Sequence, residues 1–345
     1  MAFSSAELAN IANAALDYYI DQGNVYANTL ADKPLLNLMD GKAKTFPGGK
    51  SDLSVAVKGV YTTQVAGYTH NDTVAYANPA NIQRANYAWK EHHSGISVTL
   101  TELKKDGISV TDSTTSNSVT NHSGRDKTVL VNLFQDKLDD MLEGYSRGMN
   151  DLLYGDGTAD ANALAGIRSI IVDDPSATGT TVGGLSTVTN TWWRNRANVA
   201  ISTTATGQEL IETLHSEMRQ LKRFGGKPDI AVCGSLFLDR LADELRRNGN
   251  YSNTGFSGNQ NIAVGEINYN GLKFVYDPAL DDLTISGQNP DKRCYIIDSS
   301  KLCMYYMDGE KMKRHSPARP ATQYVMFRAI TTTASLAAFQ LNCHG

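Results

Sequence analysis

One segment of the sequence has the spacing of a hydrolase nucleophile. Residues 144–148 read Gly-Tyr-Ser-Arg-Gly and match the pattern GxSxG, in which the serine of an α/β-hydrolase attacks a carbonyl carbon. That chemistry requires a sharp turn between a strand and a helix, because the turn exposes the hydroxyl group beside backbone N–H donors. Here the five residues lie within a long run of apolar residues at helical spacing. A serine hydrolase that uses Ser146 is therefore only an alternative, and we expect no catalytic residue.

The usual metal ligands do not have the spacing of a metal site. His92 and His93 are adjacent, so on a strand their side chains would point to opposite faces. The cysteines form no CxxC pair and lie mostly in apolar segments, which favours buried free thiols in a reducing cytoplasm. They are Cys233, Cys294, Cys303 and Cys343. We expect neither a metal ion nor a cofactor.

Composition limits the classes of partner. The chain has 345 residues, of which 41% are hydrophobic and 20% charged, so it can bury a core of one elaborated or two modest domains. Its 32 basic and 36 acidic residues give a net charge of −4, and a dedicated DNA-binding protein would need a basic excess. No apolar stretch is long enough to cross a bilayer, and residues 1–5 do not begin a signal peptide. We expect no membrane partner.

The strongest helical pattern covers residues 128–154. Its apolar residues recur at steps of three and four: Leu130, Phe134, Leu138, Met141, Tyr145, Met149 and Leu152. Asp126 is a candidate N-cap, and Gly155 follows the last turn. At 1.5 Å per residue the helix would be about 40 Å long. It is expected to act as a spine against which sheets pack.

Two shorter helices are predicted before it. Residues 5–22 are amphipathic, and residues 25–39 are interrupted at Pro34. Neither helix has enough apolar residues for a core of its own. Together they are expected to form an arm that packs on another surface.

A compact α/β unit is predicted in the second half. Thr206 and Glu209 have the spacing of a capping box that starts a helix, and a second helix begins at Ser235. Strands are expected at 229–233 and 272–276, and after Pro290 at 294–298, 302–307 and 324–332.

Residues 44–101 have the alternation of half-buried strands at both ends. The segment between these ends, residues 59–95, is polar and rich in tyrosine and asparagine. It is too long for a simple turn, so we expect either an extended two-stranded ribbon or a functional loop. Exposed aromatic side chains suit a contact surface. The candidate subunit-interface residues are Tyr61, Tyr68, Tyr76, Tyr87 and Trp89. We expect that an Asn-Gly turn in place of residues 60–94 would leave a folded subunit.

The order of these parts resembles the Hong Kong 97 type capsid fold, found in the major capsid proteins of tailed double-stranded DNA bacteriophages. The resemblance covers essentially the whole chain, and local segments between residues 166 and 345 are similar as well. They are Gly166–Arg168, Val182–Ser186 followed by Trp192–Asn195, Tyr269–Gly271 to Pro278, Pro317–Pro320 with Gln323–Met326, and Asn342–Gly345.

The resemblance implies an α+β fold in four parts. These are an N-terminal arm at 1–43, an extended β-hairpin loop (the E-loop) at 44–101, a peripheral P-domain at 102–200 and 285–345, and an α/β axial A-domain at 201–284. The long helix would be the spine of the P-domain.

The resemblance also implies a function. Such a subunit assembles with itself into the pentamers and hexamers of an icosahedral head, which encloses double-stranded DNA without sequence-specific binding. Separate scaffold, portal and decoration proteins are the other partners implied. The chain would assemble in the cytoplasm of a host bacterium and remain in the virion. A shell protein of a bacterial encapsulin-like nanocompartment is the alternative within the same fold.

Overall fold

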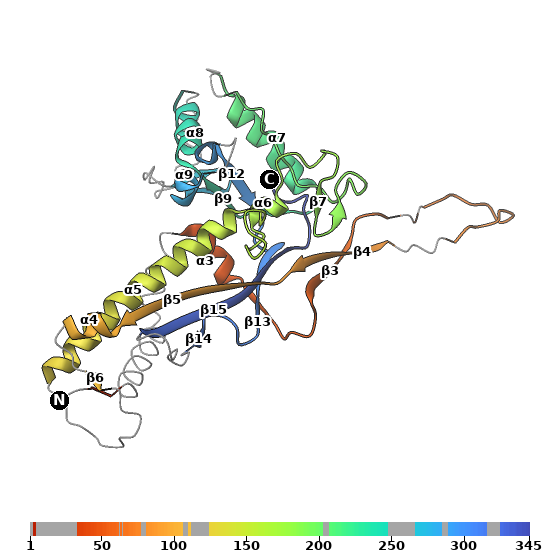
Figure 1. Cartoon of the computed structure of the whole chain (residues 1–345). Coiled ribbons are helices and arrows are strands. Elements are labelled where there is room, and N and C mark those ends of the chain that lie inside the picture. The colour runs from red at the N-terminus through yellow and green to blue at the C-terminus, as the bar shows by residue number, and fades with distance from the viewer. Residues whose placement is uncertain are drawn as a thin grey trace.

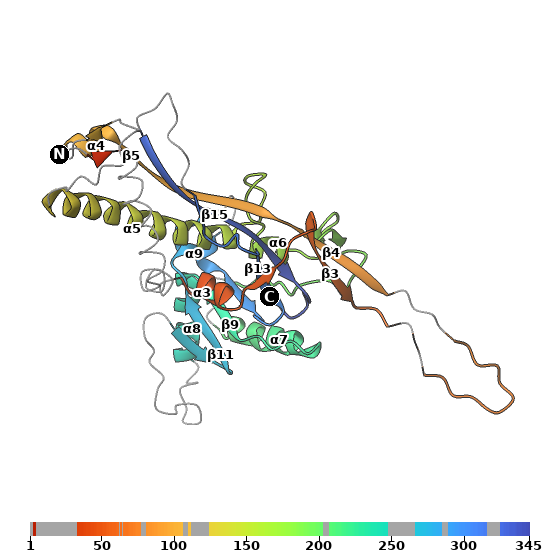
Figure 2. The same cartoon turned by 90° about the horizontal axis from the view of Figure 1, so that it is seen from below.

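A computed structural model describes residues 3–4, 33–61, 63, 65–76, 81–105, 110–111, 124–202, 207–247, 266–284, 289–315 and 325–345. The long helix α5 runs beside a sheet, a smaller α/β unit lies at one end of the helix, and one loop projects from the body (Figures 1 and 2). The helix predicted at residues 5–22 lies outside the described residues. No helix among the described residues is long and apolar enough to cross a bilayer.

The spine helix α5 spans Gly124–Tyr154. It begins four residues before the predicted start at residue 128, so Asp126 lies inside the helix and is not its N-cap. The predicted apolar stripe is buried at Leu138, Met141, Tyr145 and Met149, each less than 10% exposed, whereas its last member, Leu152, is half-buried. After a turn at Gly155, the short helix α6 (Ile167–Ile170) packs against the end of α5.

The main sheet is built around strand β15 (Val325–Ala338), which continues well beyond the predicted end at residue 332. The order is β14 (Lys313–His315), β15, β13 (Leu302–Met307) and β2 (Lys44–Phe46). Strand β5 (Lys90–Thr99) also pairs antiparallel with β15, from Val325↔Thr99 to Ala334↔Lys90. The hydroxyl groups of Tyr145 and Thr332, 2.7 Å apart, join α5 to this sheet.

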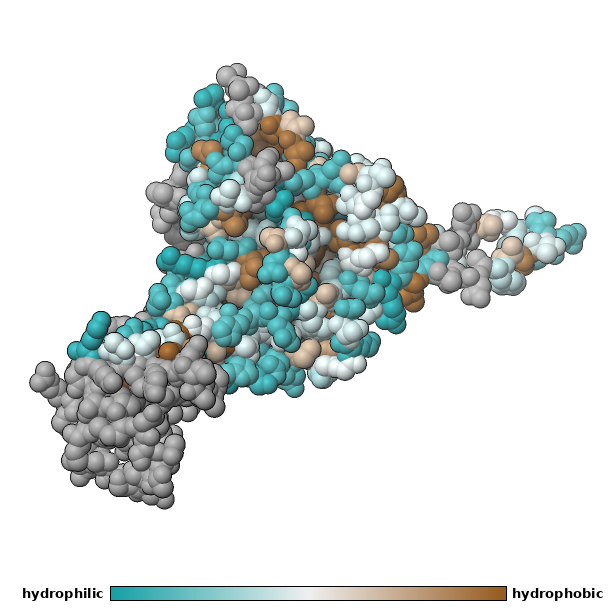
Figure 3. Space-filling model, viewed as in Figure 1, coloured by the Kyte–Doolittle hydropathy of each residue, from teal (hydrophilic) through white to brown (hydrophobic). Residues whose placement is uncertain are grey.

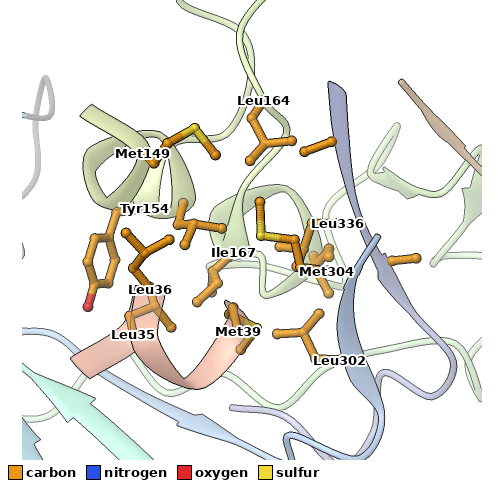
Figure 4. Packing of buried hydrophobic residues seen from close by; sticks show 14 of the residues in the cluster. Leu35, Leu36, Met39, Met149, Tyr154, Leu164, Ile167, Leu302, Met304 and Leu336 are labelled. Carbon is orange, nitrogen blue, oxygen red and sulfur yellow. The ribbon is translucent and has the colours of Figure 1, made fainter. Parts of the chain in front are cut away.

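Helix α3 (Pro34–Gly41) belongs to the core and not to a detached arm. Leu35, Leu36 and Met39 are buried beside residues of α5, α6, β13 and β15 (Figure 4). Lys33, just before the helix, forms an ion pair with Glu143 of α5 at 3.1 Å. Residues 34–41 of the expected arm therefore pack on the chain's own spine helix, which covers their apolar face.

The α/β unit contains helices α7 (Glu209–Arg223) and α8 (Ser235–Arg247). Its sheet has the order β10 (Glu266–Tyr269), β11 (Leu272–Tyr276), β9 (Ile230–Cys233) and β12 (Cys294–Ile297). Helix α7 begins at Glu209, its N-cap Gln208 makes no side-chain capping bond, and Thr206 lies outside the described residues. Glu209 is therefore the first helical residue, and it does not occupy the third position that the predicted capping box requires. Because β12 pairs with β9, the expected boundary at 284/285 falls inside this sheet.

The remaining elements are short. Strand β1 (Phe3–Ser4) pairs with β6 (Val110–Thr111), and β7 (Thr181–Val182) pairs with β8 (Leu185–Ser186). Helix α4 (Leu100–Lys105) follows β5. Helix α9 (Ala279–Asp282) and the 3-10 turn η1 (Pro290–Lys292) lie beside the α/β unit. The ribbon strands β3 and β4 are described below.

Candidate functional site

Ser146 lacks the geometry of a nucleophile. It lies inside α5, is fully buried, and donates a hydrogen bond from Oγ to the carbonyl oxygen of Glu143 at 2.9 Å. Neither glycine of the pattern has a positive φ, so the sharp turn of a nucleophile elbow is missing. The matching letters are explained by the helix, and the hydrolase alternative has no structural basis at Ser146.

The histidine pair likewise forms no metal site. His92 and His93 stand opposite Thr332 and Thr331 in the pairing of β5 with β15, and successive side chains leave opposite faces of a strand. His92 is half-buried, and burial together with the charge of Lys90 lowers its pKa. In the part of the chain that the structure describes, no cluster of three histidine, cysteine or carboxylate side chains could hold a metal ion.

The largest projecting feature is the ribbon of β3 (Asp52–Lys58) and β4 (Ile82–Ala88). The strands pair antiparallel from Asp52↔Ala88 to Lys58↔Ile82, as the alternation of residues 53–58 predicts for the first of them. Leu53, Val55 and Val57 form the buried face, and the residues between them are exposed or half-buried. The described residues of the connection between the strands, 59–61, 63, 65–76 and 81, extend away from the body in both views (Figures 1 and 2).

The root of this ribbon is held by the loop around β7 and β8. The backbone N–H of Asn86 donates to the carbonyl oxygen of Gly183 at 2.9 Å. Gly183 has a φ of 59°, and a Cβ atom there would lie 2.9 Å from the Cβ of Ala85. On the other strand, a Cβ on Gly59 would lie 2.0 Å from the ring of Trp192. Two glycines therefore let the ribbon and the body approach closely, a contact that the strand pattern alone did not predict.

Two of the five predicted interface residues belong to the chain's own core. Tyr87 is 7% exposed and donates from its hydroxyl to the carbonyl oxygen of Ala338 at 3.1 Å. Burial raises the pKa of Tyr87. Trp89 is half-buried, with its ring 5.6 Å from that of Phe46. Tyr87 lies in β4 and Trp89 lies between β4 and β5, so neither belongs to a polar loop, and their role at an interface stays a prediction.

The other three predicted residues lie on the projecting connection. Tyr61, Tyr68 and Tyr76 are 75%, 67% and 93% exposed. Val65 and Val74, which the sequence reasoning did not single out, are exposed as well. In Figure 3 this projection is narrow, with apolar residues scattered among hydrophilic ones. We call the connection between β3 and β4, residues 59–81, the finger. The described part of the chain leaves all five of these side chains exposed.

Few internal contacts shape the described part of the finger. The backbone N–H of Thr69 donates to the carboxylate of Asp72 at 2.7 Å, which keeps the pKa of Asp72 below its usual value. The side-chain amide of Asn81 donates to the carbonyl oxygen of Val60 at 2.8 Å at the base. The Lys58 ammonium group lies 5.1 Å from the ring centroid of Tyr61. These contacts form a turn and a base but bury no apolar core.

A polar junction joins the spine helix to the α/β unit. The buried carboxylate of Asp277 accepts hydrogen bonds from the Tyr154 hydroxyl at 2.8 Å and the Asn150 side-chain amide at 3.2 Å. Nearby, the Arg293 guanidinium donates two bonds to Asp173, at 2.6 and 2.7 Å. These partners are 120 or more residues apart in the chain, so no local pattern could have paired them.

Solved structures share this fold, although no protein-family model and no curated protein sequence matches the chain. A structure described as the cyanophage A-1(L) capsid asymmetric unit superposes with a TM-score of 0.57 and 18% identity, over 90% of each chain. The capsid structure of cyanophage P-SCSP1u superposes with a TM-score of 0.51 and 11% identity, over 88% of this chain and 84% of that one. The capsid of a native GTA particle superposes with a TM-score of 0.50 and 13% identity, over 90% of this chain and 88% of that one.

The likeness extends over nearly the whole chain and establishes the fold. It is a mixed α+β fold shared with phage capsid structures, as the resemblance of the sequence implied.

Proposed function

We propose that the chain is the major capsid protein of a tailed, double-stranded DNA bacteriophage. In this role identical subunits form the pentamers and hexamers of an icosahedral head. The observation that carries the proposal is the ribbon of β3 and β4, whose tip exposes tyrosine and valine side chains far from the subunit's own core. The fold shared with phage capsids supports the same reading.

The finger is suited to an intersubunit tie. Its root is fixed by strand pairing and by the contacts at Gly183 and Trp192, so the direction of the projection is set by the body. Its tip has no apolar core, so burial of its exposed aromatic side chains requires another surface. Tyr61, Tyr68 and Tyr76 are the proposed contact residues. A tip on one subunit and a different receiving surface on the next make a heterologous contact, which forms rings when the rotation between neighbours closes.

The parts of the subunit follow from this assignment, with two boundaries moved. The N-terminal arm would end before α3, because α3 is part of the core. The axial A-domain, proposed to meet its copies at ring centres, would extend from residue 201 to β12 at residue 297, because β12 completes its sheet. The P-domain would hold α5 and the main sheet, and the E-loop would be the ribbon and its finger.

The proposed contents of the shell are double-stranded DNA held without sequence-specific contacts. A net charge of −4 gives the subunit no basic excess with which to grip phosphates. Scaffold, portal and decoration proteins would be separate chains. Many weak contacts repeated around a closed shell would give it a stability that no single contact has.

Electron microscopy and sedimentation of the full chain, expressed in bacteria, test the proposal. We expect closed particles with rings of five and six subunits. Treatment with nuclease, followed by extraction of the particle contents, separates a DNA container from a nanocompartment filled with protein cargo. A chain that stays monomeric at millimolar concentration and in crowding agents would contradict the proposed assembly.

A further inference from the structure

Two cysteines of the α/β unit stand directly opposite each other. Cys233 ends β9, Cys294 begins β12, and the two residues are paired in the antiparallel register of these strands. Their Sγ atoms are 3.1 Å apart, although 61 positions separate them in the chain. Both thiols are free. Directly paired residues lie on the same face of a sheet, so the closeness of the sulfur atoms follows from the strand register.

Cys233 and Cys294 form a non-hydrogen-bonded antiparallel pair, the type in which the two side chains lie closest. Gly234 donates from its backbone N–H to Arg293, which makes 234 and 293 a hydrogen-bonded pair. On the opposite edge of β12, Ile296 exchanges both backbone bonds with Gly345, so its N–H and C=O point away from β9. Cys294 has the same parity as Ile296, and Cys233 and Cys294 are thus a non-hydrogen-bonded pair. Such pairs have Cα atoms about 4.5 Å apart, within the range of roughly 4.4–6.8 Å that a disulfide spans.

The two thiols differ in their access to solvent. Cys233 is fully buried in the apolar core of the α/β unit, and burial raises its pKa. Cys294 is half-buried and lines a groove of about 1060 Å³ between α7, α8 and β12. Leu214, Leu236 and Phe237 are among the other residues of this groove. A small oxidant can therefore reach Cys294 first, with Cys233 directly behind it.

We propose that Cys233 and Cys294 are a redox-active pair that closes to a disulfide under a peroxide, and that this bond fastens β12 to β9. The inference rests on local geometry and does not depend on the proposed role in a capsid.

The chemistry balances with hydrogen peroxide as the oxidant. The Cys294 thiol releases its proton, and the thiolate attacks one peroxide oxygen. The O–O bond breaks, Cys294 becomes a sulfenic acid, and the hydroxide that leaves takes up the released proton as water. The sulfur of Cys233 then attacks the sulfenic sulfur, and the displaced hydroxide leaves with the Cys233 proton as a second water. Two thiols lose two electrons in total, and one peroxide gains them.

The test uses the full chain, reduced and then treated with hydrogen peroxide. Remaining thiols are alkylated after denaturation, and the protein is digested with trypsin without reduction. Trypsin cleaves after Arg293 and Lys301, which separates Cys294 from Cys303. We expect a linked peptide pair that contains Cys233 and Cys294, with the intact mass reduced by two hydrogen atoms. We also expect a melting temperature several degrees higher, because the bond closes a long loop, and reversal by dithiothreitol.

Two variants serve as matched controls. Cys303→Ser with Cys343→Ser removes the other thiols and should leave the linked pair unchanged. Cys233→Ala should instead leave a sulfenic acid on Cys294 that dimedone traps, with no linked peptide and no gain in melting temperature. If either variant fails to fold, the peptide map of the wild-type chain decides alone. Recovery of both Cys233 and Cys294 as alkylated thiols after peroxide, or oxidation of Cys294 to a sulfinic acid while Cys233 stays alkylated, would overturn the proposal.

Discussion

At the scale of single residues, the hydroxyl of Ser146 serves the helix that contains it. Its hydrogen bond to Glu143 lies within α5, and alanine is the better helix former. We expect Ser146→Ala to change the free energy of unfolding by no more than about 1 kcal/mol and to leave assembly intact. Chemical denaturation and sedimentation measure both. A serine-esterase activity of the wild-type chain that disappears in this variant would contradict the structural role.

Asp173 and Arg293 offer a residue-scale prediction with a pH dependence. The guanidinium of Arg293 holds the pKa of Asp173 below its usual value. We expect Asp173→Asn to lower the free energy of unfolding at neutral pH by about 1–2 kcal/mol, because the bidentate pair is lost. A third of the Asp173 side chain reaches solvent, which keeps the effect below that of a fully buried pair.

The sign of the pH effect follows from the lowered pKa. A carboxylate stabilised in the fold contributes fully above the unfolded-state pKa, near 3.9, and loses that contribution as the pH falls through the folded-state value. The difference in the free energy of unfolding between wild type and Asp173→Asn should therefore become smaller below about pH 4. Asp160→Asn is the control, since this exposed side chain caps a turn through an oxygen that asparagine retains. If this difference in the free energy of unfolding stayed constant down to pH 2, the ion pair could not be its cause.

At the scale of elements, the close contact at Gly183 is expected to hold the ribbon. Gly183→Ala places a methyl group in a backbone region with positive φ and against Ala85 and Tyr87. Gly184→Ala imposes the same kind of backbone strain, at a φ of 76°, but its Cβ meets nothing within 4 Å. The strain alone should cost about 1–2 kcal/mol in each variant, and Gly183→Ala should cost about 1–3 kcal/mol more.

The measurement is the free energy of unfolding of both variants, with proteolysis at residues 52–88 as a local readout. Faster cleavage of the ribbon in Gly183→Ala alone would support the contact. Equal losses in the two variants would mean that the ribbon root gains nothing from this loop.

The sequence predicted best those elements in which apolar residues recur regularly along one buried face. The stripe of α5 and the alternation of residues 53–58 both appear in the structure, because each is buried along one face. Helix α3 was assigned to an arm because its few apolar residues gave no sign that α5 would cover them. Residues 82–95 were placed in a polar connection because polar side chains dominate them, yet β4 and the first half of β5 are held by β3 and β15 through backbone pairing. Pairing partners distant in sequence leave no local signal.

At the scale of the whole molecule, the subunit combines a packed body with a finger that has no core. The body buries apolar residues of α3, α5 and the main sheet in one cluster, while the finger exposes its own. Ordering such a finger costs conformational entropy that its internal contacts do not offset. A second subunit that covers the tyrosines would supply the missing burial, which couples the order of the finger to assembly.

The structure indicates a shorter deletion than the one proposed from the sequence. Removing residues 60–94 would take away all of β4 and half of β5, with the buried Ala85 and Tyr87, so an unfolded product is now expected. Removing residues 60–80 instead joins Gly59 directly to Asn81. The last strand pair, Lys58↔Ile82, then encloses a two-residue Gly-Asn loop, and glycine in the first position suits a type II′ hairpin turn. Gly59 also keeps its contact with Trp192.

We expect this shortened chain to fold with a free energy of unfolding within about 1 kcal/mol of wild type, because the described residues among those deleted are exposed. It should sediment as single subunits where the full chain forms particles, because the proposed tie between neighbours is absent. A matched control keeps the loop length and replaces Tyr61, Tyr68 and Tyr76 with serine, which should weaken assembly without changing the fold. Circular dichroism verifies folding in each case. Particles of normal size from the shortened chain would show that the finger does not join subunits, whereas a shortened chain that fails to fold would show that the finger stabilises its own body.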